Sequence, residues 1–173
     1  LHEEESEESR LLALAAGVES RSEHPLAQAV LRAAESRSIS VPDVRDFRSL
    51  PGAGATGHVD GREILVGNPE LFSVSVEAEG PLEREIDRLQ REGKTVVLVG
   101  DHTEAERSDS NILGLIAIRD RIRPNAKEAV TALHDKEIEN VVMLTGDNNR
   151  TAQAIARELG IDEVYAEIGR ASC

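Results

Sequence analysis

Residues 56–67, Thr-Gly-His-Val-Asp-Gly-Arg-Glu-Ile-Leu-Val-Gly, decide the fold of the first part of the chain. Asp60-Gly61 within this stretch is a strong signal for a tight turn, so 56–60 and 62–67 are predicted to pair as an antiparallel hairpin. Apolar periodicity and β-branched runs predict further elements around the hairpin. These are helices over 5–18, from Pro25 and over 81–91, strands over 95–99 and 112–118, and a polar hairpin tip over 102–111. We therefore expect an α+β domain in which helices flank an antiparallel sheet.

The pattern changes after Asp120. A helix is predicted to open at Pro124, followed by a strand over 141–144, a helix over 150–159 and a short strand over 164–166. Alternating helices and strands imply a parallel sheet, here part of a Rossmann-like α/β domain. We place the domain boundaries at 1–113 and 114–168, and we interpret 169–173 as a possible cloning remnant.

The composition excludes several classes of protein. The chain has 173 residues and a net charge of −13, which excludes a nucleic-acid partner because a phosphate backbone requires a basic face. Aromatic residues make up 2%, so a bound base would find few rings on which to stack. The single cysteine, Cys173, excludes a disulfide framework. No apolar run approaches the roughly 18 residues that span a bilayer, so we expect a soluble chain without direct membrane contact.

The stretch Ser22-Glu23-His24-Pro25-Leu26 is the most informative about function. Pro25 favours the first turn of a helix, which places His24 at the helix start. A neutral imidazole there can lie on a purine or hydrogen-bond to it, and the carboxylate of Glu19 can accept from an exocyclic amine. The alternative is an ordinary half-buried histidine, but the neighbouring carboxylates favour a base-binding pair.

Gly52-x-Gly54-x-x-Gly57 matches the dinucleotide-binding pattern letter for letter. That fingerprint requires a helix immediately after the glycines, and a hairpin follows instead, so a Rossmann site is excluded. The pattern still predicts bare backbone against which a ligand can pack, and the alternative is a structural bend in a strand. Gly67-Asn68 at the end of the next strand also has two interpretations. It either contacts a nucleotide or forms an ordinary turn that ends the strand.

Thr145-Gly146-Asp147 lies between a predicted buried strand and a predicted helix. In a parallel sheet this is the position at which phosphates bind, and a threonine hydroxyl can donate to a phosphoryl oxygen. The alternative interpretation of Asp147 is a helix-capping residue.

These motifs together resemble one known family. The motifs at 22–26, 52–57 and 66–68 resemble the nucleotide-binding domain of heavy-metal-transporting P-type ATPases, and Ser-Glu-His-Pro is specific to the metal-pumping branch. Asp120-x-x-Arg123-Pro124 and the stretches 143–148 and 152–161 look like the phosphorylation domain of the same pumps, which is of the haloacid-dehalogenase type. The resemblance covers nearly the whole chain.

The resemblance implies a role for each candidate residue. Glu19 and His24 match the adenine-recognising pair of the family, and Thr145 and Asp147 match residues that contact the transferred phosphate and the nucleotide region. The rest of the implied nucleotide pocket is formed by Gly52, Gly54, Gly57, Gly67 and Asn68. The implied ligand is ATP, with Mg²⁺ as its companion ion.

Two motifs of the family do not occur in this sequence. They are the Asp-Lys-Thr-Gly-Thr motif of the phosphorylated aspartate and the Gly-Asp-Gly-x-Asn-Asp motif for magnesium. We therefore expect an excised piece of an ATPase that binds ATP without turnover, with the magnesium site mostly outside it. The implied partners are the membrane, actuator and remaining phosphorylation-domain parts of the same pump, at the cytoplasmic side of the cell membrane. Copper is the predicted transported metal, with zinc, cadmium and cobalt left open.

Two other hypotheses stay open. A haloacid-dehalogenase-like phosphatase fragment would share the Thr-Gly-Asp turn but has no reason to contain Ser-Glu-His-Pro. A regulatory or interaction module without a ligand would show no stabilisation by nucleotide.

Overall fold

In a computed structural model of the chain, the described residues are 6–74, 80–103, 111–119 and 122–168. The chain divides into two compact units. The first consists of Leu1–Ala78 and Val96–Ile118, and the second of Glu79–Thr95 and Arg119–Cys173. The domain boundaries at 113 and 168 stay a prediction. Residues 79–95 belong to the second unit.

The first unit contains a five-stranded sheet. Its strands are β1 (Val44–Leu50), β2 (Gly54–Val59), β3 (Arg62–Gly67), β4 (Thr95–Asp101) and β5 (Asn111–Ile118), in the spatial order β1-β2-β3-β4-β5. The pairs β1–β2, β2–β3 and β3–β4 are antiparallel. The predicted hairpin is confirmed, because Asp60 and Gly61 connect β2 to β3 with φ of 50° and 80°. Two successive positive φ values are typical of the tight turn that Asp-Gly favours.

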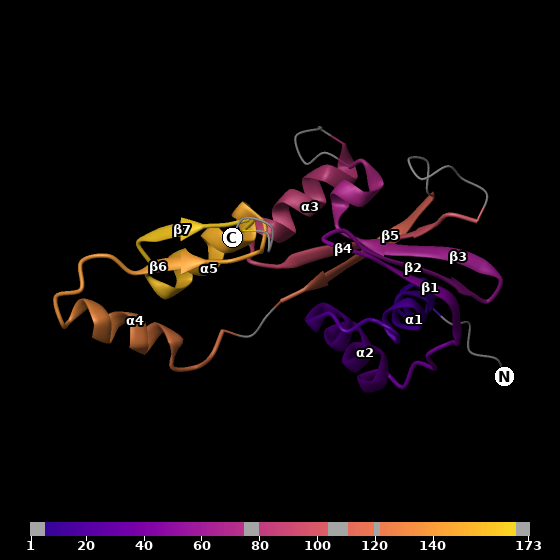
Figure 1. Cartoon of the computed structure of the whole chain (residues 1–173), viewed down its shortest axis with the longest axis horizontal. Coiled ribbons are helices and arrows are strands. Elements are labelled where there is room, and N and C mark those ends of the chain that lie inside the picture. The colour runs from indigo at the N-terminus through magenta and orange to yellow at the C-terminus, as the bar shows by residue number, and fades with distance from the viewer. Residues whose placement is uncertain (1–5, 75–79, 104–110, 120–121, 169–173) are drawn as a thin grey trace. The chain divides into compact units, whose positions relative to one another are not determined.

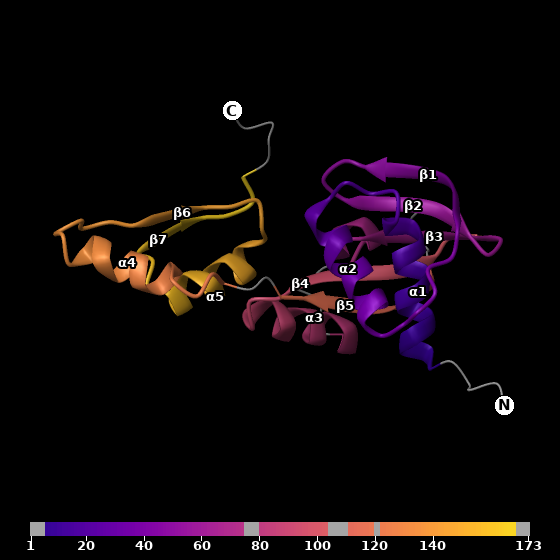
Figure 2. The ribbon, with the colours of Figure 1, turned by 90° about the horizontal axis from the view of Figure 1, so that it is seen from below.

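Two helices cover one face of this sheet (Figures 1 and 2). They are α1 (Glu7–Glu19) and α2 (Pro25–Ser36). Ser6 caps α1 by accepting from the Ser9 N–H, and Pro25 occupies the first turn of α2. The core between helices and sheet is aliphatic, as the shortage of aromatic residues requires; its fully buried members include Ala16, Val18, Val59, Ile64, Val66 and Val99. The predicted α+β fold class is thus confirmed.

The second unit contains the remaining helices and a two-stranded sheet. Its elements are α3 (Pro81–Arg91), α4 (Ala126–His134), β6 (Val142–Leu144), α5 (Asn149–Leu159) and β7 (Glu163–Tyr165). The strands β6 and β7 are parallel, as the alternating pattern predicts. Gly160 ends α5 with a left-handed φ of 77°. Helix α4 begins two residues after Pro124, where its opening was predicted.

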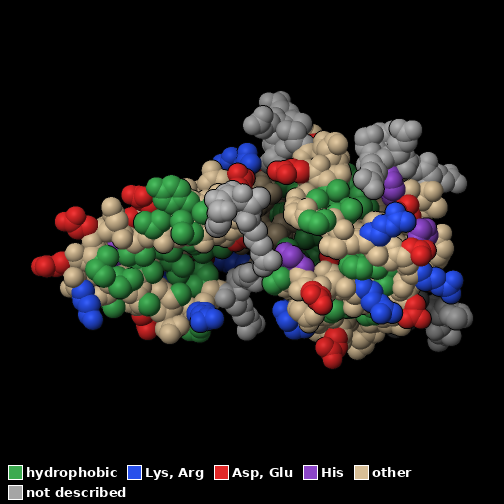
Figure 3. Space-filling model, viewed as in Figure 1, with side chains coloured by type: hydrophobic (Ala, Val, Ile, Leu, Met, Phe, Trp, Pro, Cys, Tyr) green, Lys and Arg blue, Asp and Glu red, His purple; other side chains and the backbone are tan. Residues whose placement is uncertain are grey.

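Helices α3 and α5 are held together by side chains. Arg150 forms a 2.9 Å ion pair with Asp87 on α3, and the buried Thr151 hydroxyl donates to the Lys94 carbonyl at 3.0 Å. The two-stranded sheet leaves apolar side chains exposed, and hydrophobic atoms gather on the surface over this unit in Figure 3. The most exposed of them is Leu144, at 70%.

Three predicted features fall wholly or partly outside the described residues. They are most of the hairpin tip at 102–111, Asp120 of the phosphorylation-domain motif, and the proposed cloning remnant at 169–173. Within the part of the chain that is described, no helix has the length and apolar character that a membrane crossing requires.

Candidate nucleotide-binding site

The corner between α1 and α2 contains the predicted base-binding pair. Helix α1 ends at Glu19, and the Ser20 hydroxyl donates to the Gly17 carbonyl at 2.7 Å. The Ser22 N–H donates to the Glu19 carbonyl at 3.0 Å. Helix α2 starts with Pro25. Four residues, 20–23, therefore separate Glu19 from His24.

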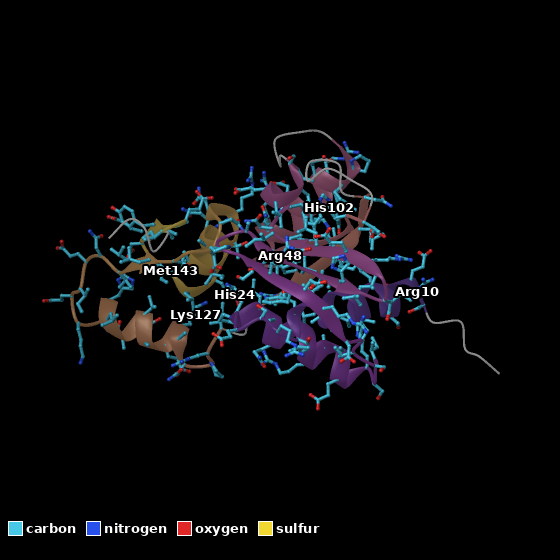
Figure 4. The ribbon with its side chains drawn as sticks, turned by 45° about the vertical axis from the view of Figure 1, so that its right-hand side comes forward. Arg10, His24, Arg48, His102, Lys127 and Met143 are labelled. Carbon is cyan, nitrogen blue, oxygen red and sulfur yellow. The ribbon has the colours of Figure 1, made fainter. Side chains whose placement is uncertain are left out.

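His24 is the N-cap of α2 (Figure 4). Its Nδ1 accepts a hydrogen bond from the Leu26 N–H at 3.2 Å. A nitrogen that accepts has no proton, so the neutral ring carries its proton on Nε2. The side chain is exposed, and Nε2 is therefore available to donate to a ligand. Capping also fixes the direction of the ring, because the ring is attached to the first turn of the helix.

Glu19 is buried, with 8% of its surface exposed, and its Oε2 has no hydrogen-bond partner among the described residues. Burial raises the pKa of this carboxyl above its ordinary value, while the Ser22 hydroxyl and the charge of His24 act to lower it. An unsatisfied buried acceptor costs about 1–3 kcal/mol. A donor that reached this oxygen, such as an exocyclic amine, would remove this penalty. Because the oxygen has almost no exposed surface, the Glu19 side chain would first have to turn outward.

The turn between β1 and β2 contains the predicted glycines. The Ala53 N–H donates to the Leu50 carbonyl at 2.9 Å and closes the turn. Gly52 has a left-handed φ of 75°, and a Cβ built on it would meet nothing within 4 Å. Gly52 is exposed, so it is the glycine of the predicted set that leaves open space beside bare backbone.

The other three glycines of the set have packing reasons. Gly54 and Gly67 are direct partners in the β2–β3 ladder, and a Cβ on Gly54 would lie 2.1 Å from the Val66 carbonyl oxygen. A Cβ on Gly67 would lie 2.4 Å from the Ala53 carbonyl oxygen, and one on Gly57 would lie 2.4 Å from a methyl of Val44. The strands at these points approach too closely for any side chain. The role of these glycines in nucleotide binding stays a prediction.

Asn68 holds the glycine turn. Its Nδ2 donates to the Gly52 carbonyl at 3.1 Å, and its Oδ1 accepts from the Leu71 N–H at 2.9 Å. The second bond caps a 3-10 helix, η1 (Pro69–Phe72), which the sequence analysis did not predict. Asn-Pro is the signal that could have indicated it, since asparagine caps well and proline suits a first helical position.

The Thr-Gly-Asp turn lies in the second unit, between β6 and α5. The Thr145 hydroxyl donates to the Asp147 carboxylate at 3.0 Å and accepts from the Asp147 N–H at 3.1 Å. The interpretation of Asp147 as a helix cap is wrong, because Asn148 caps α5 by accepting from the Thr151 N–H at 3.0 Å. Asp147 is exposed and is not needed to start the helix.

The structure therefore separates the candidates into groups. Glu19 and His24 lie together at the α1–α2 corner, and the glycines lie with Asn68 around the β1–β2 turn of the same unit. No hydrogen bond or ion pair among the described residues joins these two groups. Thr145 and Asp147 belong to the other unit. The sequence analysis included Ser22 in the motif at 22–26 but gave it no contact of its own; in the structure its Oγ accepts from the His24 N–H at 3.3 Å.

The described residues contain no cluster of three His, Cys, Asp or Glu side chains that could hold a metal ion. The Thr145–Asp147 turn offers one carboxylate, and Mg²⁺ beside a nucleotide is usually held by one or two carboxylates together with the phosphates. The described residues alone therefore do not form a complete Mg²⁺ site.

Comparison with known proteins identifies the family to which the chain belongs. The model of the haloacid dehalogenase-like hydrolases matches residues 2–172, which is nearly the whole chain. The chain belongs to this family. The predicted phosphorylation-domain type is of the same family, so this part of the prediction is confirmed.

The similar proteins are heavy-metal P-type ATPases. A probable cadmium-transporting ATPase of Staphylococcus aureus (strain MRSA252) is 37% identical over 166 residues, which are 94% of this chain and 22% of the relative. A copper-transporting P-type ATPase of Rhizobium leguminosarum bv. viciae is 40% identical over 161 residues, which are 93% of this chain and 18% of the relative. The crystal structure of a zinc-transporting PIB-type ATPase in the E2.Pi state is 36% identical, with a TM-score of 0.65, over 93% of this chain and 24% of that one.

These similarities confirm the predicted resemblance to heavy-metal P-type ATPases, which are enzymes. The chain spans about a fifth of the length of the relatives that it matches. The names of the relatives include cadmium, copper and zinc, so the comparison supports a heavy-metal pump without selecting copper.

Proposed function

We propose that this chain is the ATP-binding part of a heavy-metal P-type ATPase, on the cytoplasmic side of the membrane, and that it positions ATP for transfer of its γ-phosphate to a catalytic aspartate elsewhere in the same pump. The rest of the phosphorylation domain, the actuator and the membrane part are its partners. The chain alone binds ATP without turning it over.

The observation that carries this proposal is the buried, unpartnered Oε2 of Glu19. The exocyclic amine of adenine is a donor of the kind that this oxygen lacks. His24 adds an Nε2–H donor that faces solvent, with its ring direction fixed by the cap at Leu26. A carboxylate acceptor at the end of α1 and an imidazole donor at the start of α2 suit a base that carries both an amine and ring nitrogens. We therefore place adenine at the α1–α2 corner.

The phosphates are proposed to lie along backbone without side chains. Gly52 supports this placement, because its Cα faces open space and its carbonyl is held by Asn68. In the second unit, Thr145 and Asp147 are proposed to contact the transferred γ-phosphate. In that contact the Thr145 hydroxyl would turn from the Asp147 carboxylate toward a phosphoryl oxygen. Mg²⁺ would neutralise charge on the phosphates when ATP is bound.

A phosphatase of the haloacid-dehalogenase type is the second candidate, since the family model covers such enzymes too. The antiparallel unit with Glu19 and His24 favours the pump, because a small-phosphate hydrolase does not need a base-binding pair. Nucleotide binding separates the two, because the pump part would bind ATP through its base, whereas a phosphatase part would not prefer ATP to a small phosphate ester such as p-nitrophenyl phosphate.

The test is a titration of ATP followed by amide NMR shifts, on the unaltered chain and on His24→Ala. The control is His58→Ala, which removes another exposed histidine of the same unit, one that pairs with Asp46 at 3.6 Å. We expect ATP to shift amides around 19, 24 and 52, His24→Ala to lose most of the affinity, and His58→Ala to retain it. At 100 times its dissociation constant, ATP should also stabilise the chain by about 2.7 kcal/mol. No response to millimolar ATP would replace the proposal by the interaction-module hypothesis.

Copper is the metal that we propose for the parent pump, in line with the 40% identical copper-transporting relative. Metal selection depends on parts of the pump outside this chain. The measurement is metal-stimulated ATPase activity of the full-length protein with Cu⁺, Zn²⁺, Cd²⁺ and Co²⁺ in parallel. Stimulation by one of the other ions and not by Cu⁺ would replace copper by that metal.

A further inference from the structure

We propose that Thr151 is a positioning residue, which fixes the start of α5 and thereby holds the Thr145–Asp147 turn in place for the transferred phosphate. This inference rests on the proposed function, since it concerns the same phosphate contact. It goes beyond that function because Thr151 lies at neither the base nor the phosphate. Its effect is on the rate of phosphoryl transfer and not on the affinity for ATP.

The Thr151 hydroxyl attaches the start of α5 to a distant segment of the chain. Thr151 is 2% exposed, and its hydroxyl donates to the Lys94 carbonyl at 3.0 Å. The same oxygen accepts from the Asn148 Nδ2 at 3.0 Å. A threonine hydroxyl has one hydrogen to donate, and the bond to Lys94 uses it. Lys94 is 57 residues away in sequence and immediately precedes β4, so this bond is a tertiary contact rather than part of the helix.

Thr151 also holds both polar atoms of the Asn148 side chain. Its N–H donates to the Asn148 Oδ1 at 3.0 Å, which is the N-cap bond of α5, and its hydroxyl accepts from the Nδ2. Asn148 directly follows Asp147, so a fixed Asn148 limits where the Asp147 carboxylate can lie. That carboxylate accepts from the Thr145 hydroxyl at 3.0 Å. Hydrogen bonds and the peptide bond between Asp147 and Asn148 thus connect the Thr151 hydroxyl to the turn.

One other polar contact attaches the start of α5 to the segment that precedes β4. It is the ion pair between Arg150 and Asp87 of α3, at 2.9 Å, and the two side chains are 42% and 26% exposed. Ion pairs in contact with solvent contribute little to stability, because water screens them and two long side chains must be ordered. The Thr151 bond is buried and has no such competitor, so it is the firmer of the two attachments.

Phosphoryl transfer depends on the position of the contacting groups more strongly than ATP binding does. Catalysis of this reaction is almost entirely positioning and electrostatic stabilisation. Misplacement of a group by about 1 Å can slow a reaction about 100-fold. The proposed base-binding residues, Glu19 and His24, belong to the other unit. Loss of the Thr151 hydroxyl should therefore lower the rate of transfer and leave the affinity for ATP unchanged, as expected for contacts made in the transition state.

The experiment follows phosphoenzyme formation in the full-length pump, mixed rapidly with ATP labelled at its γ-phosphate and quenched with acid. The variants are Thr151→Val, which has nearly the same shape without the hydroxyl, and Thr151→Ser, which keeps the hydroxyl. The control is Thr131→Val, which removes a hydroxyl that donates to the Lys127 carbonyl within α4 at 3.0 Å. We expect Thr151→Val to lower the rate constant at saturating ATP by about tenfold, since the ion pair of Arg150 still holds the helix. The ATP concentration at half-maximal rate should not change. Thr151→Ser should recover most of the rate, and Thr131→Val should match the unaltered pump.

The rate constant separates positioning from a loss of folded protein. A variant that only unfolds more readily forms less phosphoenzyme but forms it at the unaltered rate constant. An unaltered rate constant in Thr151→Val would therefore overturn the inference, and so would a higher half-maximal ATP concentration at an unaltered maximal rate. An equal loss of rate in Thr151→Ser would also overturn it, because the hydroxyl would then not be the group that matters.

A second variant decides the question if Thr151→Val does not fold. Asn148→Ser keeps an oxygen that can cap α5 but loses the Nδ2 donor to the Thr151 hydroxyl. It should lower the rate constant without changing the half-maximal ATP concentration, and an unaltered rate constant would overturn the inference. An unaltered pump that forms no phosphoenzyme from ATP would instead overturn the proposed function, and the role of Thr151 with it.

Discussion

The β1–β2 turn offers a matched pair of substitutions that separates backbone strain from steric conflict. Gly52 and Gly54 are two residues apart, and both have a φ that side chains rarely adopt, 75° and 157°. A Cβ on Gly52 would meet nothing within 4 Å, whereas a Cβ on Gly54 would lie 2.1 Å from the Val66 carbonyl oxygen and 2.6 Å from the Gly67 Cα. Replacement of each glycine by alanine therefore adds the same atom to two different surroundings.

The expected losses of unfolding free energy follow from these surroundings. For Gly52→Ala, left-handed backbone is the main penalty, about 1–2 kcal/mol. For Gly54→Ala, the φ region is one that almost only glycine adopts, which costs about 1–3 kcal/mol. The overpacking of β2 against β3 adds about another 1–3 kcal/mol, because contacting backbone atoms cannot rotate away as a side chain can. Gly54→Ala should thus lose about 2–6 kcal/mol, a large part of the stability of a typical domain.

The assay is urea denaturation followed by the methyl NMR signals of Ile64 and Val66, which lie in the core of the first unit. These signals report on that unit alone. Gly52→Ala should remain folded, so its affinity for ATP can be measured, and we expect a loss of about tenfold because the added methyl occupies the open space proposed for phosphate. Equal stability losses in the two variants would refute the argument, since only Gly54 has a neighbour within contact distance.

Three further predictions concern single side chains. Asn68→Ala should lower the unfolding free energy by about 2 kcal/mol in urea denaturation, because two hydrogen bonds are lost, each worth about 1 kcal/mol. Asn148→Ala should speed amide exchange in α5 and lower the unfolding free energy by about 1 kcal/mol, because the helix loses its N-cap. Asp147→Ala should change the unfolding free energy by less than about 0.5 kcal/mol. A larger loss in Asp147→Ala than in Asn148→Ala would show that Asp147 is the cap after all. The raised pKa of Glu19 means that the folded chain binds the proton of this carboxyl more tightly than the unfolded chain does. The unfolding free energy should therefore fall as pH rises from the ordinary pKa of 4.5 through the folded pKa. Glu19→Gln should flatten this dependence in urea midpoints measured from about pH 4 to about pH 8.

Local signals were sufficient for most of the fold. Asp60-Gly61 specified the hairpin because a two-residue turn with positive φ at both positions accepts few other residues. Gly160 specified the end of α5 for the same kind of reason. The irregularity in β1, where Asp46 has a φ of 50° and the register shifts between Arg45 and Arg48, has no such signal. Bulges depend on the pairing of two strands, which the sequence of one strand does not contain.

The glycine pattern shows what a sequence motif can predict and what it cannot. The sequence indicated correctly that side chains are excluded from this region, but it could not say what excludes them. Gly54, Gly57 and Gly67 are needed because protein atoms lie within 2.5 Å of where a Cβ would be. Gly52 is needed because of its backbone angle, and the space beside it is open. Only the positions of distant residues, such as Val44 and Val66, distinguish a glycine that packs from one that leaves room.

Glu19 could be identified from the sequence as a candidate for base binding, but the free-energy cost of ionising its buried carboxyl could not. The carboxylate lies at the last residue of α1, where the helix dipole is negative, and the last turn has no basic residue to compensate. The side chain is buried, and Oε2 has no partner among the described residues. These three effects all destabilise the ionised group, and a neutral residue at the same position would avoid all of them. Functional sites are the places where a fold retains such local conflicts. A donor supplied by a ligand would resolve this one, and that is the strongest physical reason to place the base of ATP at this corner.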